Sequence, residues 1–94
     1  MQNAIIEGKI LNIFETEAKT EKFQIRVLWL ENKEDKYIRH YEVEFQNRAT
    51  ADLDAFREGQ KVQVEVEPRG WKFTTKAGEE KIKMSLTAKG IRKI

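Results

Sequence analysis

The segment Arg69-Gly70-Trp71-Lys72-Phe73 places two aromatic rings and two cations within five consecutive residues. Non-specific binding of a single-stranded nucleic acid needs these groups, because aromatic planes stack on bases, at about 1–3 kcal/mol per base, and cations follow the phosphates. Trp71 and Phe73 have the same parity, so an extended backbone directs both rings to one side and Lys72 to the other. The alternative interpretation is that both rings cap a hydrophobic core.

Two further aromatic residues are candidates for stacking. Trp29 continues the parity of Ile25 and Val27, so we expect it to fill the core or an interface, with stacking on a base as the less favoured role. Phe45 shares the parity of Val43, and alternation alone does not decide which side of that strand faces the core. Stacking and burial both remain open for Phe45.

Basic residues near these rings are candidate phosphate contacts. They are Arg69, Lys72, Lys76, Lys81 and Lys83, together with Arg39 and His40 at the start of another expected strand. Exposed lysines on a strand also prevent sheets from pairing edge to edge, so they can equally serve solubility. Glu42 and Glu44 oppose binding, because they would repel phosphates if they lay on the same face.

Charge and composition narrow the classes of function. The net charge is only +2, but residues 81–94 carry five basic side chains and no acidic one, so the C-terminal strand is a basic stripe. The chain has no cysteine and a single histidine, which argues against a metal site, a cofactor and a catalytic nucleophile. Without an apolar run of membrane-spanning length or a signal segment, we expect a soluble, cytoplasmic protein that does not contact a membrane and is not an enzyme.

Alternating apolar residues predict the strands that must position these side chains. The expected strands span residues 4–14, 23–30, 37–46, 62–67 and 82–88. Gly8 indicates a bend in the first of them, and Pro68 is expected to end the fourth. Residues 31–36 have no apolar side chain and predict a hairpin loop, whereas residues 69–80 predict a loop or an extended hairpin.

The remaining segment, residues 50–59, predicts a short helix. It begins at a hydroxyl side chain, has Leu53 and Phe56 three residues apart and ends at Gly59. Three strands, one helix and two strands, in that order, are typical of the five-stranded OB-fold barrel, an all-β fold with one short helix between strands 3 and 4. We therefore expect a single OB-fold domain over residues 1–94, with a small SH3-like barrel as the main competitor.

From His40 onward, about fifty residues resemble the bacterial single-stranded DNA-binding protein family. The similar segments are the strand from His40 to Phe45, Arg57-Glu58-Gly59, Val62-Gln63-Val64-Glu65, Arg69-Gly70-Trp71-Lys72-Phe73-Thr74 and Gly78. The start, Asn3 and Ile5-Ile6-Glu7-Gly8-Lys9-Ile10, is similar with one residue fewer. The chain departs from the family at Val66, where glycine is usual, and at Phe73, where tryptophan is usual.

The resemblance implies sequence-tolerant binding of single-stranded DNA, with RNA as an option, in DNA replication or repair. It also implies a homo-oligomer, dimer or tetramer, and base stacking at Phe45 and Phe73. Because this chain stops at Ile94 without the family's acidic tail, it looks like a divergent, tail-less relative. The alternative is an OB-fold module for protein–protein assembly that does not bind nucleic acid. It would bind another protein or a copy of itself through Leu28, Trp29 and Leu30 and the acidic faces of the third and fourth strands.

Overall fold

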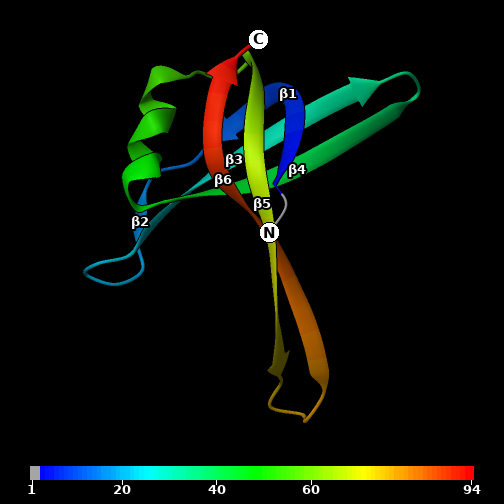
Figure 1. Cartoon of the computed structure of the whole chain (residues 1–94). Helices are drawn as coiled ribbons and strands as arrows, with labels where there is room; N and C mark the ends of the chain where they lie inside the picture. The colour runs from blue at the N-terminus through cyan, green and yellow to red at the C-terminus, as the bar shows by residue number, and fades with distance from the viewer. Residues whose placement is uncertain (1–2) are drawn as a thin grey trace.

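The computed structural model describes residues 3–94, and they form a closed barrel of strands with a helix at one end (Figure 1). In chain order the elements are β1 (Ala4–Ile13), β2 (Glu17–Ala18), β3 (Gln24–Glu34), β4 (Tyr37–Gln46), the 3-10 helix η1 (Asn47–Ala55), β5 (Lys61–Thr74) and β6 (Glu80–Lys93). Apart from the two-residue β2, this is the expected order of three strands, one helix and two strands.

Strand pairing closes the barrel. The sheet order is β1-β5-β6-β4-β3-β2, and an additional pairing between β1 and β3 joins its ends. The contact of β4 with β6 is parallel, with Val43 opposite Leu86, whereas the other pairings are antiparallel. The five-stranded, OB-fold-like barrel with one short helix between β4 and β5 is therefore confirmed.

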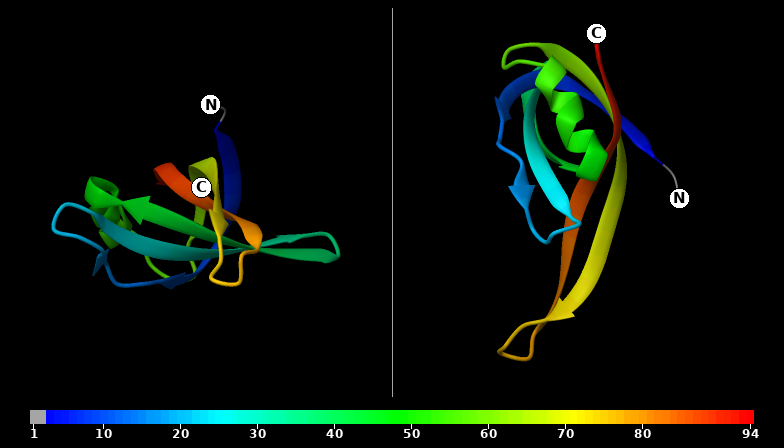
Figure 2. Two further views of the ribbon diagram at one scale, coloured as in Figure 1. Left: turned by 90° about the horizontal axis from the view of Figure 1, so that it is seen from below. Right: turned by 90° about the vertical axis from the view of Figure 1, so that its left-hand side faces the viewer.

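One parity of each long strand fills the barrel. The buried apolar side chains are Ile10, Leu28, Leu30, Val43, Phe45, Leu53, Val62, Val64, Val66 and Ala88. Because successive side chains of a strand point to opposite faces, most of their polar neighbours lie outside, whereas Thr87, next to Ala88, is buried. Leu53 is contributed by η1, which covers one end of the barrel (Figure 2).

The first strand bends as Gly8 predicts, because β1 pairs with β5 over its first half and with β3 over its second half. At Gly8 an added Cβ would lie 2.9 Å from the carbonyl oxygen of Glu31, so only glycine permits this approach of the two backbones. The register then shifts between Ile10 and Asn12. A bulge of this kind increases the local bend that a small barrel requires.

The expected loop over residues 31–36 is wrong. β3 continues to Glu34 and β4 begins at Tyr37, so a two-residue turn at Asp35 and Lys36 joins them, with Asp35 at φ 54°. This end of the hairpin projects from the barrel (Figure 1), where both faces meet water and apolar alternation is not required. Charged residues therefore form strand here.

Pro68 does not end the fourth long strand, because β5 runs through it and stays paired with β6 as far as Thr74 opposite Glu80. The described pairing of β1 with β5 stops at Val66, and among residues 3–94 only β6 is paired with β5 beyond that point. A proline without a backbone donor is tolerated at such an edge. Residues 69–85 thus form a two-stranded extended hairpin, called the arm below, which projects from the barrel (Figures 1 and 2).

The expected helix is present but begins earlier and is wound more tightly. Residues Asn47–Ala55 form a 3-10 helix, and its N-cap, Gln46, makes no side-chain capping hydrogen bond. Thr50 lies inside the helix and donates its hydroxyl to the carbonyl oxygen of Asn47 at 2.7 Å. Gly59, at φ 88°, belongs to a separate turn after the helix. The expected N-cap at Thr50 is therefore wrong.

Candidate nucleic-acid interface

The arm has two faces that differ in chemistry. Trp71 lies directly opposite Lys83, and Phe73 lies opposite Lys81, in the antiparallel register of β5 and β6. Directly opposed residues of two antiparallel strands project to the same side. We call this side, with Arg69 two residues before Trp71, the aromatic face of the arm. The register therefore brings together five of the residues proposed from the sequence.

Both rings of the aromatic face are accessible. Trp71 is 48% exposed and Phe73 is 40% exposed. Two residues along an antiparallel strand span about 6.8 Å, so each ring has room to receive a planar group of its own. The rings therefore do not cap the barrel core, and each has a cation beside it, Lys83 and Lys81 respectively.

Arg69 is held at the base of the arm by Glu67. Its Nε donates to Oε1 of Glu67 at 2.5 Å. The hydrogen bond from Arg69, helped by the positive charge of Lys89, lowers the pKa of the Glu67 carboxyl. Glu67 therefore remains ionised at neutral pH and fixes the direction of the guanidinium, whose terminal nitrogens stay available as donors.

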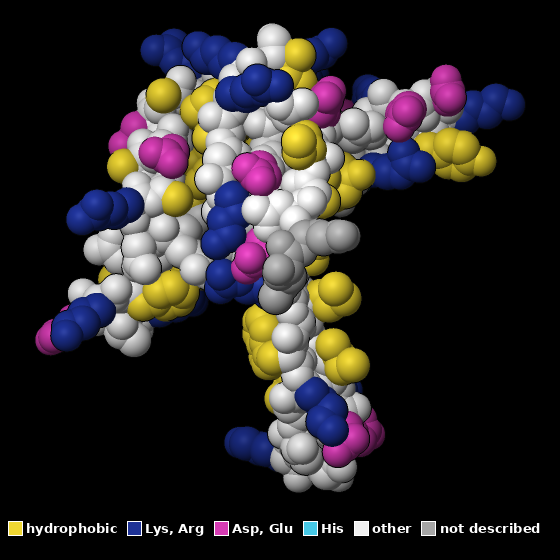
Figure 3. All heavy atoms as spheres, in the orientation of Figure 1, with side chains coloured by type: hydrophobic (Ala, Val, Ile, Leu, Met, Phe, Trp, Pro, Cys, Tyr) yellow, Lys and Arg dark blue, Asp and Glu magenta, His cyan; other side chains and the backbone are white. Residues whose placement is uncertain are grey.

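The opposite side of the arm, called the apolar face, carries Gly70, Lys72, Ile82 and Met84. Ile82 is 72% exposed and Met84 is 70% exposed. Lys72 lies here, with its Nζ 3.6 Å from Oε1 of Glu80, so it is not beside the aromatic rings. Figure 3 shows hydrophobic side chains on both sides of the arm and basic ones towards its tip.

Charge is distributed unevenly between the arm and the barrel. Residues 69–85 carry five basic and two acidic side chains, a net charge of +3, whereas the whole chain has a net charge of only +2. Lys76 lies in the tip turn, where the backbone N–H of Gly78 donates to the carbonyl oxygen of Thr75 at 2.9 Å. The arm therefore accounts for all the net positive charge of the protein.

Trp29 does not fill the core as its parity predicts. It is 42% exposed and lies on the outside of β3, because Leu28 and Leu30 take the inside. Its ring packs edge to face on Phe14, with centroids 4.8 Å apart. Its Nε1 donates to Oε2 of Glu42 at 2.8 Å. Phe14 is a partner that the sequence interpretation missed, because only the barrel closure brings the end of β1 to this face.

Phe45 is a core residue and does not contact a base. Its side chain is 0% exposed and lies among the buried core residues, so no base can reach it in the folded protein. Leu28 and Leu30 are also 0% exposed, which removes them from the proposed assembly surface. Both corrections have one cause: closure of the barrel buries the side of β3 that carries the two leucines, and the β3–β4 register places Phe45 on that same side.

Arg39 and His40 lie on β4, opposite Asn32 and Glu31 of β3, and not on the arm. Arg39 Nη1 lies 3.4 Å from Oε2 of Glu34, and His40 Nε2 lies 3.2 Å from Oε2 of Glu31. Each of the two basic side chains therefore has a carboxylate within its own hairpin. The structure does not bring them to the aromatic face.

Glu42 and Glu44 lie on the outside of β4, as the unfavourable interpretation of the sequence supposed. Glu42 is opposite Trp29 in the register, and Oε1 of Glu44 accepts a hydrogen bond from Gln46 at 3.3 Å. The outside of β3 and β4 therefore combines an accessible ring with carboxylates. Its negative charge repels phosphates, whereas the positive charge of the arm attracts them.

Two other kinds of site receive no support within residues 3–94. No group of three or more histidine, aspartate or glutamate side chains is arranged there to hold a metal ion. In the same residues, no helix is long and apolar enough to cross a membrane.

The fold is similar to that of solved single-stranded DNA binding proteins. One crystal form of the mitochondrial protein Rim1 from S. cerevisiae superposes with a TM-score of 0.76 and 19% identity, covering 99% of this chain and 94% of that one. A second crystal form gives a TM-score of 0.77 and 18% identity, covering 99% and 95%. At this level of identity the similarity establishes the fold alone.

Sequence comparison adds a family without a described activity. A family model described as a domain of unknown function, DUF3127, matches residues 5–91. Comparison with curated protein sequences finds no match. The function must therefore be argued from the geometry of the arm.

Proposed function

The chain belongs to the DUF3127 family, described as a domain of unknown function, and we propose that it binds single-stranded DNA without sequence preference. Binding takes place on the aromatic face of the arm. Bases stack on Trp71 and Phe73, while Lys81, Lys83 and Arg69 neutralise phosphates. The observation that carries the proposal is the register that sets Lys83 opposite Trp71 and Lys81 opposite Phe73.

Stacking supplies affinity without base readout, because every base has a π-face. The two exposed rings project from a two-stranded arm, so bases can approach them without displacing core side chains. Guanidinium and ammonium groups beside the rings then meet the phosphates that connect the stacked bases. The proposal therefore predicts tolerance of sequence and strong dependence on salt.

The choice of DNA over RNA is supported by the likeness of fold to the yeast Rim1 structures, which are of a mitochondrial single-stranded DNA binding protein. Because the sequence identity to Rim1 is only 19%, the main support for binding of single strands comes from the residues of the arm. Oligo-thymidine and oligo-uridine of equal length, titrated in parallel, test this choice. Equal affinity for both would limit the proposal to single strands in general.

The first experiment is a fluorescence titration of a Trp29→Phe variant with oligo-thymidine, so that Trp71 is the remaining tryptophan. We expect salt-sensitive quenching, because a stacked base quenches the exposed indole. In the same background, Phe73→Ala should weaken binding about five- to 150-fold, the equivalent of about 1–3 kcal/mol for one stacked base.

Met84→Ala is the matched control, because Met84 lies on the apolar face of the same arm and is also exposed. It should leave the affinity unchanged. A flat titration at low salt would refute the proposal. So would an equal loss of affinity in Met84→Ala and Phe73→Ala, because the arm would then matter only as a whole.

A second candidate function is assembly of the chain with a copy of itself, through the apolar face of the arm. Ile82 and Met84 are largely exposed there, and an isolated two-stranded hairpin is marginally stable in water unless its apolar side is covered. Beside them, Lys72 and Glu80 lie 3.6 Å apart, and a two-fold related copy can meet this pair with its own in reverse order.

The oligomeric state tests this second candidate directly. Light scattering during gel filtration should report a dimer or tetramer for the unmodified chain and a monomer for Ile82→Ser/Met84→Ser. A monomer in both cases would exclude assembly through this face. Oligonucleotide binding measured on the same samples separates assembly from binding of nucleic acid.

A further inference from the structure

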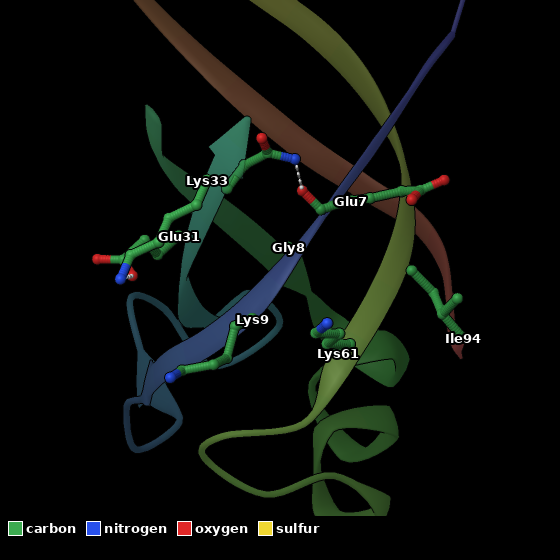
Figure 4. Close-up of a pocket in the computed structure, with 8 residues that line it drawn as sticks. Glu7, Gly8, Lys9, Glu31, Lys33, Lys61 and Ile94 are labelled. Atoms are coloured by element: carbon green, nitrogen blue, oxygen red, sulfur yellow. Dashed lines mark hydrogen bonds and ion pairs between the residues drawn. The ribbon is translucent and has the colours of Figure 1, made fainter. Parts of the chain in front are cut away.

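A cavity of about 370 Å³ opens on the barrel at the point where β1 passes from β5 to β3 (Figure 4). Lys9 is the residue at which β1 exchanges partners, since it is opposite Lys61 of β5 and also opposite Glu31 of β3. The rest of the lining consists of Glu7, Gly8, Asn32, Lys33 and Ile94. The volume lies within the range of about 300–1,000 Å³ in which proteins hold small ligands.

Lys9 and Lys61 are directly opposite each other on paired strands, and this arrangement of two like charges destabilises the sheet unless another group offsets it. Directly opposed residues of antiparallel strands have Cβ atoms only about 4.5–5.5 Å apart, and like charges at such positions destabilise a sheet. Within residues 3–94, neither ammonium group makes an ion pair. In that part of the chain, two lysines therefore occupy directly opposed positions with no carboxylate at ion-pair distance from either ammonium group.

The Glu31 carboxylate, although opposite Lys9 in the register, is directed to other side chains. Its Oε1 lies 3.8 Å from Nζ of Lys33, and its Oε2 lies 3.2 Å from Nε2 of His40. Figure 4 shows the Lys33 side chain extended beside this carboxylate.

The second carboxylate of the lining, Glu7, is also directed elsewhere. Its Oε1 accepts a hydrogen bond from Nε2 of Gln63 at 3.2 Å. In Figure 4 its carboxylate lies over β5, on the far side of Gly8 from Lys9. Lys9 and Lys61 therefore remain available to a ligand from solution.

We propose that this cavity binds a terminal phosphate group, held by the ammonium groups of Lys9 and Lys61. A terminal phosphate carries about −1.5 to −2 charge at neutral pH and three acceptor oxygens, which matches two ammonium groups. Lysine is a regular phosphate ligand as a point charge. The same chemistry occurs in a small phosphorylated molecule and at a phosphorylated end of a nucleic acid strand.

This site is separate from the aromatic face of the arm. Lys61 opens β5 and Trp71 lies ten residues further along the same strand, which corresponds to about 33 Å of extended backbone. Loss of one site therefore does not imply loss of the other. The phosphate site stands even if the arm binds no nucleic acid.

The test follows backbone amide signals by NMR while pyrophosphate is added at constant ionic strength. We expect saturable shifts at Gly8, Lys9 and Lys61. Lys9→Gln/Lys61→Gln should weaken pyrophosphate binding at least about tenfold, because it removes both charge-assisted contacts. The variant should melt no lower than the unmodified protein, since it also removes a like-charge pair.

Lys22→Gln/Lys36→Gln, which removes the same charge from two exposed positions outside both proposed sites, is the matched control and should bind pyrophosphate as the unmodified protein does. Equal weakening in both variants, or shifts that do not saturate, would overturn the proposal, because only the general positive field would then attract the anion.

The source of the phosphate is distinguished by two oligo-thymidines that differ only in a 5′-phosphate or a 5′-hydroxyl. Shifts at Gly8 and Lys61 with the phosphorylated strand alone would assign the site to strand ends. Shifts with pyrophosphate and with neither strand would assign it to a small phosphorylated molecule. No shift at these amides with pyrophosphate or with either strand would overturn the proposal.

Discussion

Replacing the two lysines of the aromatic face tests the electrostatic part of the proposed function. Lys81 and Lys83 lie directly opposite Phe73 and Trp71, so each is expected to neutralise one phosphate of a strand stacked there. For single strands, each neutralised phosphate contributes about 0.7 to the slope of log affinity against log salt concentration. Lys81→Gln/Lys83→Gln should therefore lower the magnitude of this slope by about 1.4.

The slope predicts how the loss of affinity depends on salt. The double variant should bind more weakly than the unmodified protein at about 50 mM salt, and this deficit should shrink about sevenfold when the salt is raised to about 200 mM. Fluorescence anisotropy of a labelled oligo-thymidine across a salt series measures both quantities. Thermal melting of the variant verifies that the arm and barrel remain folded.

Lys72→Gln is the matched control, since Lys72 lies on the same arm but on the apolar face, beside Glu80. It should leave the slope unchanged. A double variant with the unmodified slope would refute the assignment of Lys81 and Lys83 as phosphate contacts. If Lys72→Gln lowered the magnitude of the slope by about 0.7, the contribution expected from Lys81 or Lys83 alone, the arm would act only through its total charge.

Phe45→Ala should destabilise the fold by about 3–5 kcal/mol in urea denaturation, because this ring is fully buried; unchanged stability with weaker oligonucleotide binding would contradict its assignment to the core. Gly8→Ala should lower the melting temperature, since its Cβ would lie 2.9 Å from a backbone oxygen, whereas Gly90→Ala meets nothing within 4 Å and should not. NMR titration should give Glu67 a pKa below its ordinary value of 4.5, and Arg69→Gln should raise it. A lowered folded-state pKa stabilises the protein above that ordinary value, and this contribution is lost as the pH falls through the folded-state pKa.

Local sequence patterns were sufficient to predict the fold class. The alternation of Val62, Val64 and Val66 with polar residues predicts a strand with one buried face, and all three valines are fully buried or nearly so. Gly8 predicts a bend because a backbone without a Cβ permits close approach, and β1 bends there. These features depend on neighbours within a few residues, so they can be inferred without knowledge of the barrel.

Other features depend on contacts between distant segments, and here the patterns failed. β3 has apolar residues on both parities, with Val27 and Trp29 on one side and Leu28 and Leu30 on the other, so its local pattern cannot select the buried face. Closure of the barrel selects the leucines and leaves Trp29 outside. Likewise, Pro68 continues a strand because, among the described residues, only β6 is paired with β5 at that point.

The sequence by itself determined the chemical content of the candidate interface, two aromatic rings within a basic segment, because Trp71 and Phe73 share parity in any extended backbone. Only the tertiary structure decided which cations accompany them. Lys72 is adjacent in the chain but lies on the other face, whereas Lys81 and Lys83 reach the rings through the β5–β6 register. Register is a property of two paired strands, and a shift of one residue would exchange the faces.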